Sequence, residues 1–194
     1  MSLSIQHIES VLRSYQYQTQ PSSTETRWAG VAMILKQLPN EPLSVLLIRR
    51  SENPNDPWSG HMAMPGGKMD PCDANTRQAA ERETLEEVGL EINTHGRHLG
   101  RLDDVTAVAR GQQLGLVIAP WVYVLNKEVT LNHNHEVQET IWVPVSDLMS
   151  DQFRDTLPYD LGGTQLLLPC WRWKGRVIWG LTYGMLDTLF RVIS

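Results

Sequence analysis

The chain has 194 residues, of which 41% are hydrophobic, and its formal net charge is −5. The sequence contains no long basic run, which argues against a nucleic-acid partner bound through its phosphates. It has no apolar stretch close to the roughly 20 residues that cross a bilayer, and its N-terminal segment lacks the apolar core of a signal peptide. We therefore expect a single domain over residues 1–194 with no membrane partner.

The two cysteines, Cys72 and Cys170, are far apart in the sequence and belong to no group with the spacing of metal ligands. This pattern favours two reduced thiols in a cytoplasmic protein over a disulfide. Cytoplasmic localisation is therefore the expectation.

Hydrophobic periodicity and turn residues predict the elements. The N-terminal half is predicted to contain a helix at 4–18 capped by Ser4, a polar mobile linker at 19–27, strands at 28–38 and 43–49 in a hairpin, and a helix from Asn75 or Thr76 to Gly89. The C-terminal half is predicted to contain strands at 98–105, 114–125 and 141–145, a short helix at 147–149 capped by Ser146, hairpin strands at 165–170 and 176–179, and a helix at 182–193. Pro120 is expected to mark a bulge or an edge. Because helices and strands do not alternate strictly, a mixed sheet flanked by helices, an α/β (α+β) fold, is favoured over a doubly wound parallel sheet.

A long loop at 51–64, rich in Pro, Asn and Gly, lies between two predicted strands. Loops of this kind in a compact domain are usually functional or mobile. Trp58 fits either a substrate platform or an aromatic residue that packs the loop onto the core. His61 fits either a catalytic role or a hydrogen-bonded structural role.

The stretch 64–90, MPGGKMDPCDANTRQAAERETLEEVGL, joins a Pro-Gly-Gly turn to an acidic helix. Helical spacing places Glu83, Glu86 and Glu87 within about 100° of one another, in one acidic cluster. Ala79, one turn earlier on the same face, is small enough to admit another segment. The opposite face, directed toward the core, would carry the three side chains Thr84, Leu85 and Val88.

Three clustered carboxylates repel one another, and a solvated acidic face is their usual explanation. Here a glycine-rich turn is set against the same helix, and Mg²⁺ commonly pairs a few carboxylates with substrate phosphates. Gly66 and Gly67 allow close approach of the backbone to a ligand. Lys68 could meet phosphate charge, and Arg82 could hold carboxylates through its planar fork.

These residues resemble the signature of the Nudix hydrolase family, G-x5-E-x7-R-E-U-x-E-E-x-G-U, in which U is apolar. The second half, 82–90, matches throughout if Thr84 is accepted at a U position. In the first half, Asp73 stands in place of Glu, and eight residues rather than seven separate it from Arg82. The resemblance implies a Nudix-type α/β/α sandwich with a mixed sheet and a loop-helix catalytic motif at 66–90.

One branch, the coenzyme A pyrophosphatase-like Nudix proteins, is similar over about residues 28–190. The similarity lies in LLIRRSENPNDPWSGHMAMPGGKMDPCD (46–73), in VIWGLT (177–182), and in Glu136-Val137 ahead of Trp142-Val143-Pro144. The sequence departs from the branch in three places. Met64 replaces Phe, the loop reads Gly-His-Met-Ala rather than Gly-Gln-Val-Ala, and Glu81 replaces an apolar residue.

The resemblance implies hydrolysis of a nucleoside-diphosphate derivative by Mg²⁺ or Mn²⁺, with the metal held by Glu83, Glu86, Glu87 and the Gly66 carbonyl. Arg82 would orient the glutamates. Glu136 would supply a further carboxylate, with Glu139 as the alternative. The phosphates would be met by Gly67, Lys68 and Arg49 or Arg50. His133 and His135 resemble a metal pair only superficially.

The expected substrate is coenzyme A or acyl-CoA. An NDP-sugar, ADP-ribose or a dinucleotide is the first alternative, and a catalytically silent nucleotide-binding module is the second. Assembly as a homodimer is a further option.

Overall fold

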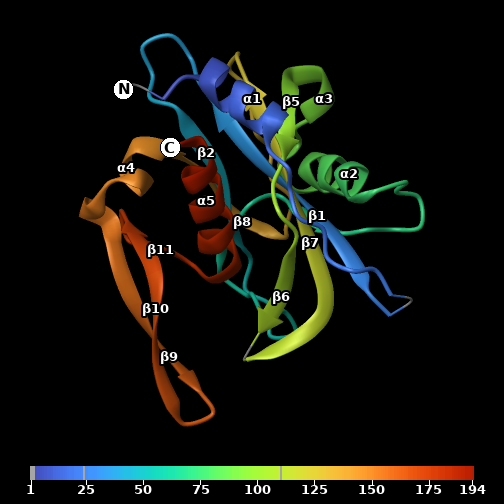
Figure 1. The fold of residues 1–194 in the computed structure, drawn as a ribbon, viewed down its shortest axis with the longest axis vertical. Helices are drawn as coiled ribbons and strands as arrows, with labels where there is room; N and C mark the ends of the chain where they lie inside the picture. The colour runs from blue at the N-terminus through green and yellow to red at the C-terminus, as the bar shows by residue number, and fades with distance from the viewer. Residues whose placement is uncertain (1–2, 24, 110) are drawn as a thin grey trace.

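The computed structural model describes residues 3–23, 25–109 and 111–194, and its centre is a mixed eight-stranded sheet (Figure 1). The main order is β3-β2-β1-β7-β5, while β4 pairs with β1, β6 with β7 and β8 with β2. The bounds are β1 Arg27–Lys36, β2 Ser44–Arg50, β3 Met62–Ala63, β4 Gly66–Lys68, β5 Gly96–Arg101, β6 Val105–Ala109, β7 Gln112–Leu125 and β8 Val137–Pro144. The pairing of β1 with β7 is parallel, and the other pairings are antiparallel.

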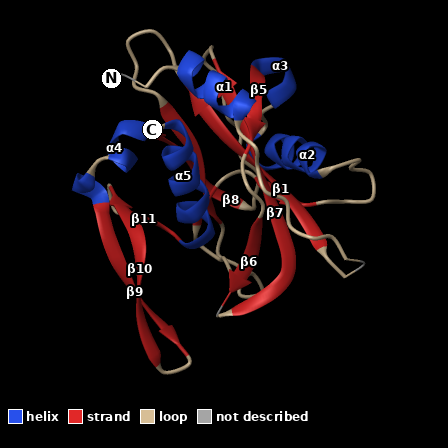
Figure 2. Ribbon diagram, in the orientation of Figure 1, coloured by secondary structure: helices blue, strands red, loops and turns tan. Residues whose placement is uncertain are grey.

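Helices cover both faces of this sheet (Figure 2). Their bounds are α1 Ile5–Ser14, α2 Thr76–Val88, α3 Ile92–His95, α4 Val145–Met149 and α5 Gly180–Ile193. On β1, Ala32 and Ile34 belong to the core that includes α2, whereas Met33 and Leu35 belong to the core that includes α1 and α5. A strand buried on both faces explains why the sequence of β1 reads as an almost continuous apolar run.

A separate three-stranded sheet, in the order β11-β10-β9, projects away from the body in Figure 1. Its strands are β9 Arg154–Leu161, β10 Thr164–Trp173 and β11 Arg176–Trp179. The hairpin of β10 and β11 was predicted, but β9 was missed. Pro158 explains the omission, because proline removes a ladder donor and argues against a strand unless the strand lies at an edge, as β9 does.

Helix α2 packs unusually close to β1. A Cβ on Gly30 would lie 1.7 Å from the carbonyl oxygen of Thr76, so a side chain at this position would push the helix off the sheet. The Asn75 side chain accepts the N–H groups of Arg77 and Gln78, and Gly89 ends the helix in the left-handed region with φ 68°. Asn75, one of the two predicted caps, and the Gly89 stop are thereby confirmed.

Two of the other predicted local features are present in the structure, and two differ from it. The Ser4 cap and the antiparallel β1–β2 hairpin are confirmed. The Ser146 cap is wrong, because α4 begins two residues earlier than predicted, with Pro144 at its N-cap and no side-chain cap bond. Pro120 marks neither a bulge nor an edge, since it pairs with Val31 in an unbroken register inside β7.

The polar segment predicted as a mobile linker is hydrogen-bonded near its start. The carboxylate of Asp104 accepts the backbone N–H of Gln20 at 3.0 Å. The rest of the prediction includes Thr24, which lies outside the described residues. Both cysteines are free thiols, Cys72 exposed and Cys170 buried. Among the described helices, none has the length and apolar character needed to cross a membrane.

Candidate active site

The glycine-rich turn and α2 form one unit on β1. Strand β4 pairs with β1 so that Gly67 lies opposite Gly30, which places the turn beside the helix. The N–H of Gly66 donates to Oε2 of Glu87 at 2.9 Å. Gly66 has φ 147°, and a Cβ there would meet the Gly30 carbonyl at 2.4 Å, so only glycine fits.

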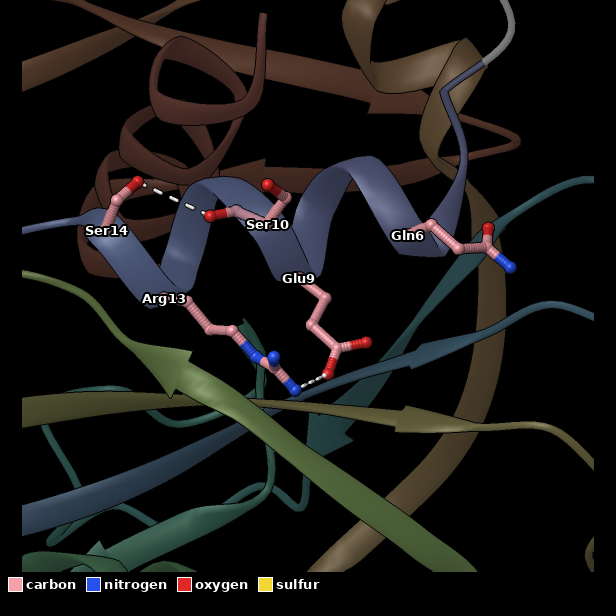
Figure 3. A pocket seen from close by; sticks show the side chains of 5 residues that line it. All are labelled: Gln6, Glu9, Ser10, Arg13 and Ser14. Carbon is pink, nitrogen blue, oxygen red and sulfur yellow. Dashed lines mark hydrogen bonds and ion pairs between the residues drawn. The ribbon is translucent and has the colours of Figure 1, made fainter.

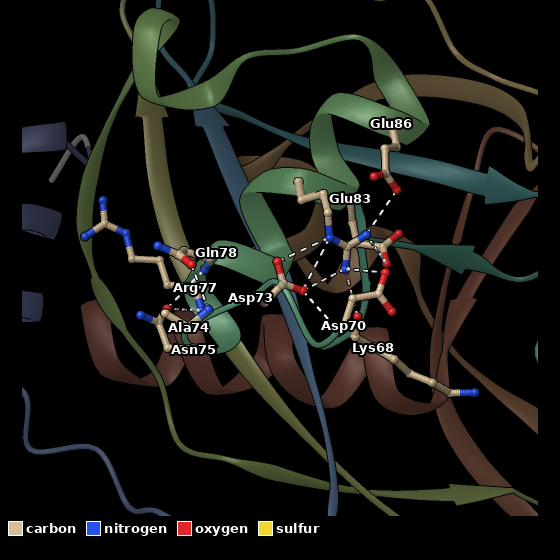
Figure 4. Close-up of polar contacts among 10 residues, drawn as sticks. Lys68, Asp70, Asp73, Ala74, Asn75, Arg77, Gln78, Glu83 and Glu86 are labelled. Atoms are coloured by element: carbon tan, nitrogen blue, oxygen red, sulfur yellow. Dashed lines mark hydrogen bonds and ion pairs between the residues drawn. The ribbon is translucent and has the colours of Figure 1, made fainter.

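Arg82 contacts residues of α2 and of the preceding loop, and Figure 4 shows four of these partners, Lys68, Asp73, Glu83 and Glu86, gathered beside the helix. Its Nη1 lies 3.1 Å from Glu83 Oε1 and 3.1 Å from Glu86 Oε2. Its Nη2 lies 2.9 Å from Asp73 Oδ2 and donates to the Lys68 carbonyl at 3.0 Å. The guanidinium therefore ties two helix glutamates to the preceding loop, and Asp73 is its partner there despite the inserted residue.

The three glutamates differ in environment. Glu87 is only 2% exposed, and burial is the main reason that its pKa rises to about 8. Burial also raises the pKa of the half-buried Glu83, while the Arg82 charge opposes that rise. The Glu86 side chain is 52% exposed.

The described residues contain no group of three or more His, Cys, Asp or Glu side chains gathered closely enough to hold a metal ion as they stand. Instead, Glu83 and Glu86 lie against Arg82, and Glu87 lies against Gly66. The metal-binding role predicted for Glu83, Glu86, Glu87 and the Gly66 carbonyl therefore stays a prediction.

The chemistry of these groups nevertheless fits a hard divalent cation. All the candidate donors are oxygens, which Mg²⁺ and Mn²⁺ prefer. Glu87 is a buried carboxylate whose nearest guanidinium, that of Arg50, is 3.9 Å away. A buried carboxylate without a close counter-charge is costly to ionise, and a bound cation would remove that cost.

A cavity of about 610 Å³ opens beside this unit. Gly66, Gly67, Lys68, Glu83 and Glu87 line one part of it. Gly67 lies directly under Glu83, since a Cβ at Gly67 would be 2.4 Å from the carboxylate. The predicted loop-helix residues and a cavity large enough for a small molecule are thus brought together.

The structure separates the alternatives left open among the charged residues. Arg50 lines the cavity and pairs with Asp56 at 2.6 Å, whereas Arg49 lies outside the cavity beside Glu52. Glu136 lines the cavity, and its charge contributes to the raised pKa values of Glu83 and Glu87.

Glu139, the alternative to Glu136, accepts a hydrogen bond from Nε of Arg176 at 2.7 Å. That contact keeps the pKa of Glu139 low. His133 and His135 are exposed and do not line the cavity.

The rest of the cavity wall includes two residues whose roles the sequence left open and others to which it gave no role. Trp58 and His61 come from the long loop. Trp58 packs against the core, which confirms one of its two interpretations, while its role as a substrate platform stays a prediction. Trp179, Leu181, Thr182 and Met185 come from the end of β11 and from α5. For Trp179, Leu181 and Thr182 the sequence signal was the similarity of VIWGLT (177–182) to the coenzyme A pyrophosphatase-like branch, which assigned no role to any of them.

A second hollow, of about 440 Å³, lies on α1 and is lined by polar residues of that helix alone (Figure 3). Glu9 pairs with Arg13 at 2.7 Å across it. This surface holds ordinary exposed ion pairs and none of the predicted residues.

Comparisons with known proteins agree with this architecture. The NUDIX domain family model matches residues 26–160. An uncharacterized Schizosaccharomyces pombe protein, C14C4.10c, is 37% identical over 119 residues, which are 60% of this chain and 36% of that protein. The peroxisomal coenzyme A diphosphatase ndx-8 of Caenorhabditis elegans is 34% identical over 134 residues, which are 68% of this chain and 55% of that protein. The chain therefore spans about a third to a half of these curated relatives.

A crystal structure of a MutT/nudix family protein from Enterococcus faecalis has a TM-score of 0.56 to this chain at 19% identity. The match covers 98% of this chain and 70% of that one. At this identity the match shows the fold alone, and it confirms the expected α/β sandwich with a mixed sheet. Since the family model covers more than half of the chain and includes the whole loop-helix unit, the chain belongs to the Nudix hydrolase family.

Proposed function

We propose that this chain is a divalent-metal-dependent pyrophosphohydrolase that cleaves a nucleoside-diphosphate-linked substrate at its diphosphate. The observation that carries the proposal is the contact between Gly66 and the buried Glu87, because it fixes the acidic helix beside a cavity of about 610 Å³. Lys68 and Arg50 line the same cavity and would meet phosphate oxygens.

In this proposal Glu83, Glu86, Glu87 and the Gly66 carbonyl would hold Mg²⁺ or Mn²⁺, which would supply charge neutralisation at the diphosphate and would lower the pKa of water. Arg82 positions Glu83 and Glu86 by donating hydrogen bonds to both carboxylates. Glu136 accepts the proton of the attacking water. The water oxygen bonds to one phosphorus, the bridging P–O bond breaks, and two phosphate monoesters leave.

Coenzyme A or an acyl-CoA is the substrate that we propose. The named activity of the Caenorhabditis elegans relative and the resemblance over 46–73 support it. Met64, at a position where that branch has Phe, lines the cavity and is a point of difference. A single-domain organisation, cytoplasmic localisation and homodimer formation stay predictions.

The test is a substrate panel of coenzyme A, acetyl-CoA, ADP-ribose, NDP-sugars and diadenosine polyphosphates, with products identified by mass spectrometry. We expect coenzyme A or its thioesters to be cleaved fastest with Mg²⁺ or Mn²⁺, and Glu87→Gln to abolish turnover. Turnover in excess chelator would refute the metal dependence. Faster cleavage of another diphosphate would move the substrate assignment to that compound. If no compound were cleaved with any divalent metal, the nucleotide-binding module would become the preferred interpretation.

A further inference from the structure

Part of the cavity wall is built by the C-terminal part of the chain, beyond the family-matched segment. The family match ends at residue 160, whereas Trp179, Leu181, Thr182 and Met185 all line the cavity. The loop-helix unit and Glu136 lie inside the matched residues. The groups proposed for the chemistry therefore lie inside the matched region, and part of the substrate wall is supplied from outside it.

Two aromatic rings in this wall lie against each other although they are far apart in sequence. The centroids of the His61 and Trp179 rings are 4.8 Å apart. The ring of Tyr159, from β9, lies 5.6 Å from Trp179 on the projecting sheet. Trp179 and His61 both line the cavity, whereas Tyr159 is not among its lining residues.

The backbone holds both rings in place. Trp179 ends β11, and Gly180, with φ 61°, turns the chain directly into α5. Two residues later, the buried hydroxyl of Thr182 donates to the carbonyl of Met62 at 2.9 Å, which ties α5 to the residue after His61. The His61 carbonyl in turn accepts the N–H of Arg50 at 3.0 Å. The aromatic pair is therefore anchored to the strand that carries Arg50.

We infer that Trp179 and His61 form a stacking platform for the base of the bound nucleoside and so favour ligands that carry a base over other phosphate esters. The inference rests on the proposed function, because it places one end of the same nucleoside diphosphate. Aromatic side chains stack on any base, and removal of such a stack typically weakens binding between about fivefold and a hundredfold. Burial lowers the pKa of His61, so its ring meets the base in the neutral form at pH 7.

The test measures binding by calorimetry in chelator, so that no hydrolysis is needed. The probes are ADP, AMP and ribose 5-phosphate: AMP differs from ribose 5-phosphate only in the base, and ADP adds the second phosphate. We expect Trp179→Leu to weaken ADP and AMP binding about tenfold and to leave ribose 5-phosphate unchanged, and Trp179→Phe to retain most of the affinity. Trp142→Leu is the matched control, because Trp142 is a partly buried tryptophan on β8 that does not line the cavity.

His61→Ala provides a second variant on a loop if Trp179→Leu fails to fold, and the same selective loss of ADP binding is expected. Unchanged ADP binding in both variants, or equal weakening of all three probes, would overturn the platform. Weakened binding of pantetheine with unchanged ADP binding would also overturn the platform, because the apolar wall would then hold the pantetheine arm of the substrate rather than the base. An active enzyme with unchanged ADP binding refutes the platform alone. An inactive protein that loses ADP binding on substitution refutes only the proposed hydrolysis.

Discussion

Oδ2 of Asp73 lies 2.9 Å from Nη2 of Arg82, and Nη1 of the same guanidinium lies 3.1 Å from both Glu83 and Glu86. Asp73 is only 4% exposed, and the hydrogen bond from Arg82 lowers its pKa. Arg82 therefore links a loop carboxylate to two helix carboxylates, which fixes where the latter two lie.

Replacing Asp73 should disturb the two glutamates through Arg82. We expect Asp73→Asn to lower kcat by about 10- to 100-fold, the usual effect of losing a partner that orients a ligating group, with a smaller effect on KM. Asp73→Glu should retain more activity than Asp73→Asn, because the carboxylate is kept. Asp70→Asn is the control, since Asp70 is 61% exposed and lies 3.9 Å from Arg82. Equal kcat values for Asp73→Asn and Asp70→Asn would contradict the positioning role.

The burial of Glu87 predicts a pH dependence of stability in the metal-free protein. Its folded-state pKa of about 8 lies above the ordinary value of 4.5, so the folded chain keeps a proton that the unfolded chain has lost between these pH values. The free energy of unfolding should therefore fall as pH rises from about 5 to about 8. Thermal unfolding in chelator should show a lower Tm at pH 8 than at pH 6.

Glu87→Gln should flatten this dependence, because glutamine accepts the Gly66 hydrogen bond without a charge. Glu86→Gln is the matched control and should keep the wild-type slope, since that side chain is 52% exposed. A wild-type Tm that rises from pH 6 to pH 8 would show that Glu87 is ionised in the folded, metal-free chain.

Glu136 and Glu139 should separate cleanly in kinetics. Glu136 lines the cavity, so Glu136→Gln should lower kcat by about 100-fold or more if this carboxylate takes the proton of water. Glu139 instead pairs with Arg176, and both side chains are partly exposed. Glu139→Gln should leave kcat within about twofold and cost about 1 kcal/mol or less of stability. The reverse pattern of kcat values would assign the proton transfer to Glu139.

Local signals in the sequence carried much of the fold. The Asn75 cap, the Gly89 stop and the β1–β2 hairpin depend on residues within a few positions of one another, and all three are confirmed. The loop-helix unit was recognisable for the same reason. Its motif is continuous in the sequence, whereas the contact between Gly66 and Glu87, 21 residues apart, arises because β4 and α2 both pack on β1.

Features set by distant parts of the chain were harder to predict. Leu85 was expected in the core but is 49% exposed. The acidic face of α2 is itself packed against the loop, with Ala79 and Glu87 buried, and this leaves Leu85 pointing outward. The approach of Trp179 to His61 depends on the path of α5, which no local pattern encodes.

Glu81, which stands where the branch has an apolar residue, forms a polar pair with Tyr123 that can be tested by a double-mutant cycle. The Tyr123 hydroxyl donates to Glu81 at 2.8 Å, and Arg77 donates to the same carboxylate at 2.8 Å. Tyr123→Phe should lower the free energy of unfolding by about 1–2 kcal/mol, because the largely buried Glu81 loses a donor.

In the background of Glu81→Leu, the Tyr123→Phe substitution should cost about 1 kcal/mol less, and this difference is the coupling energy. Urea unfolding measures all four variants, and kcat should stay near the wild-type value because neither residue lines the cavity. Tyr17→Phe, at a residue that is 42% exposed, should be nearly neutral. A coupling energy of zero would mean that the Glu81 carboxylate is stabilised by Arg77 alone. Tyr123 would then not explain why this chain has Glu81 where the branch has an apolar residue.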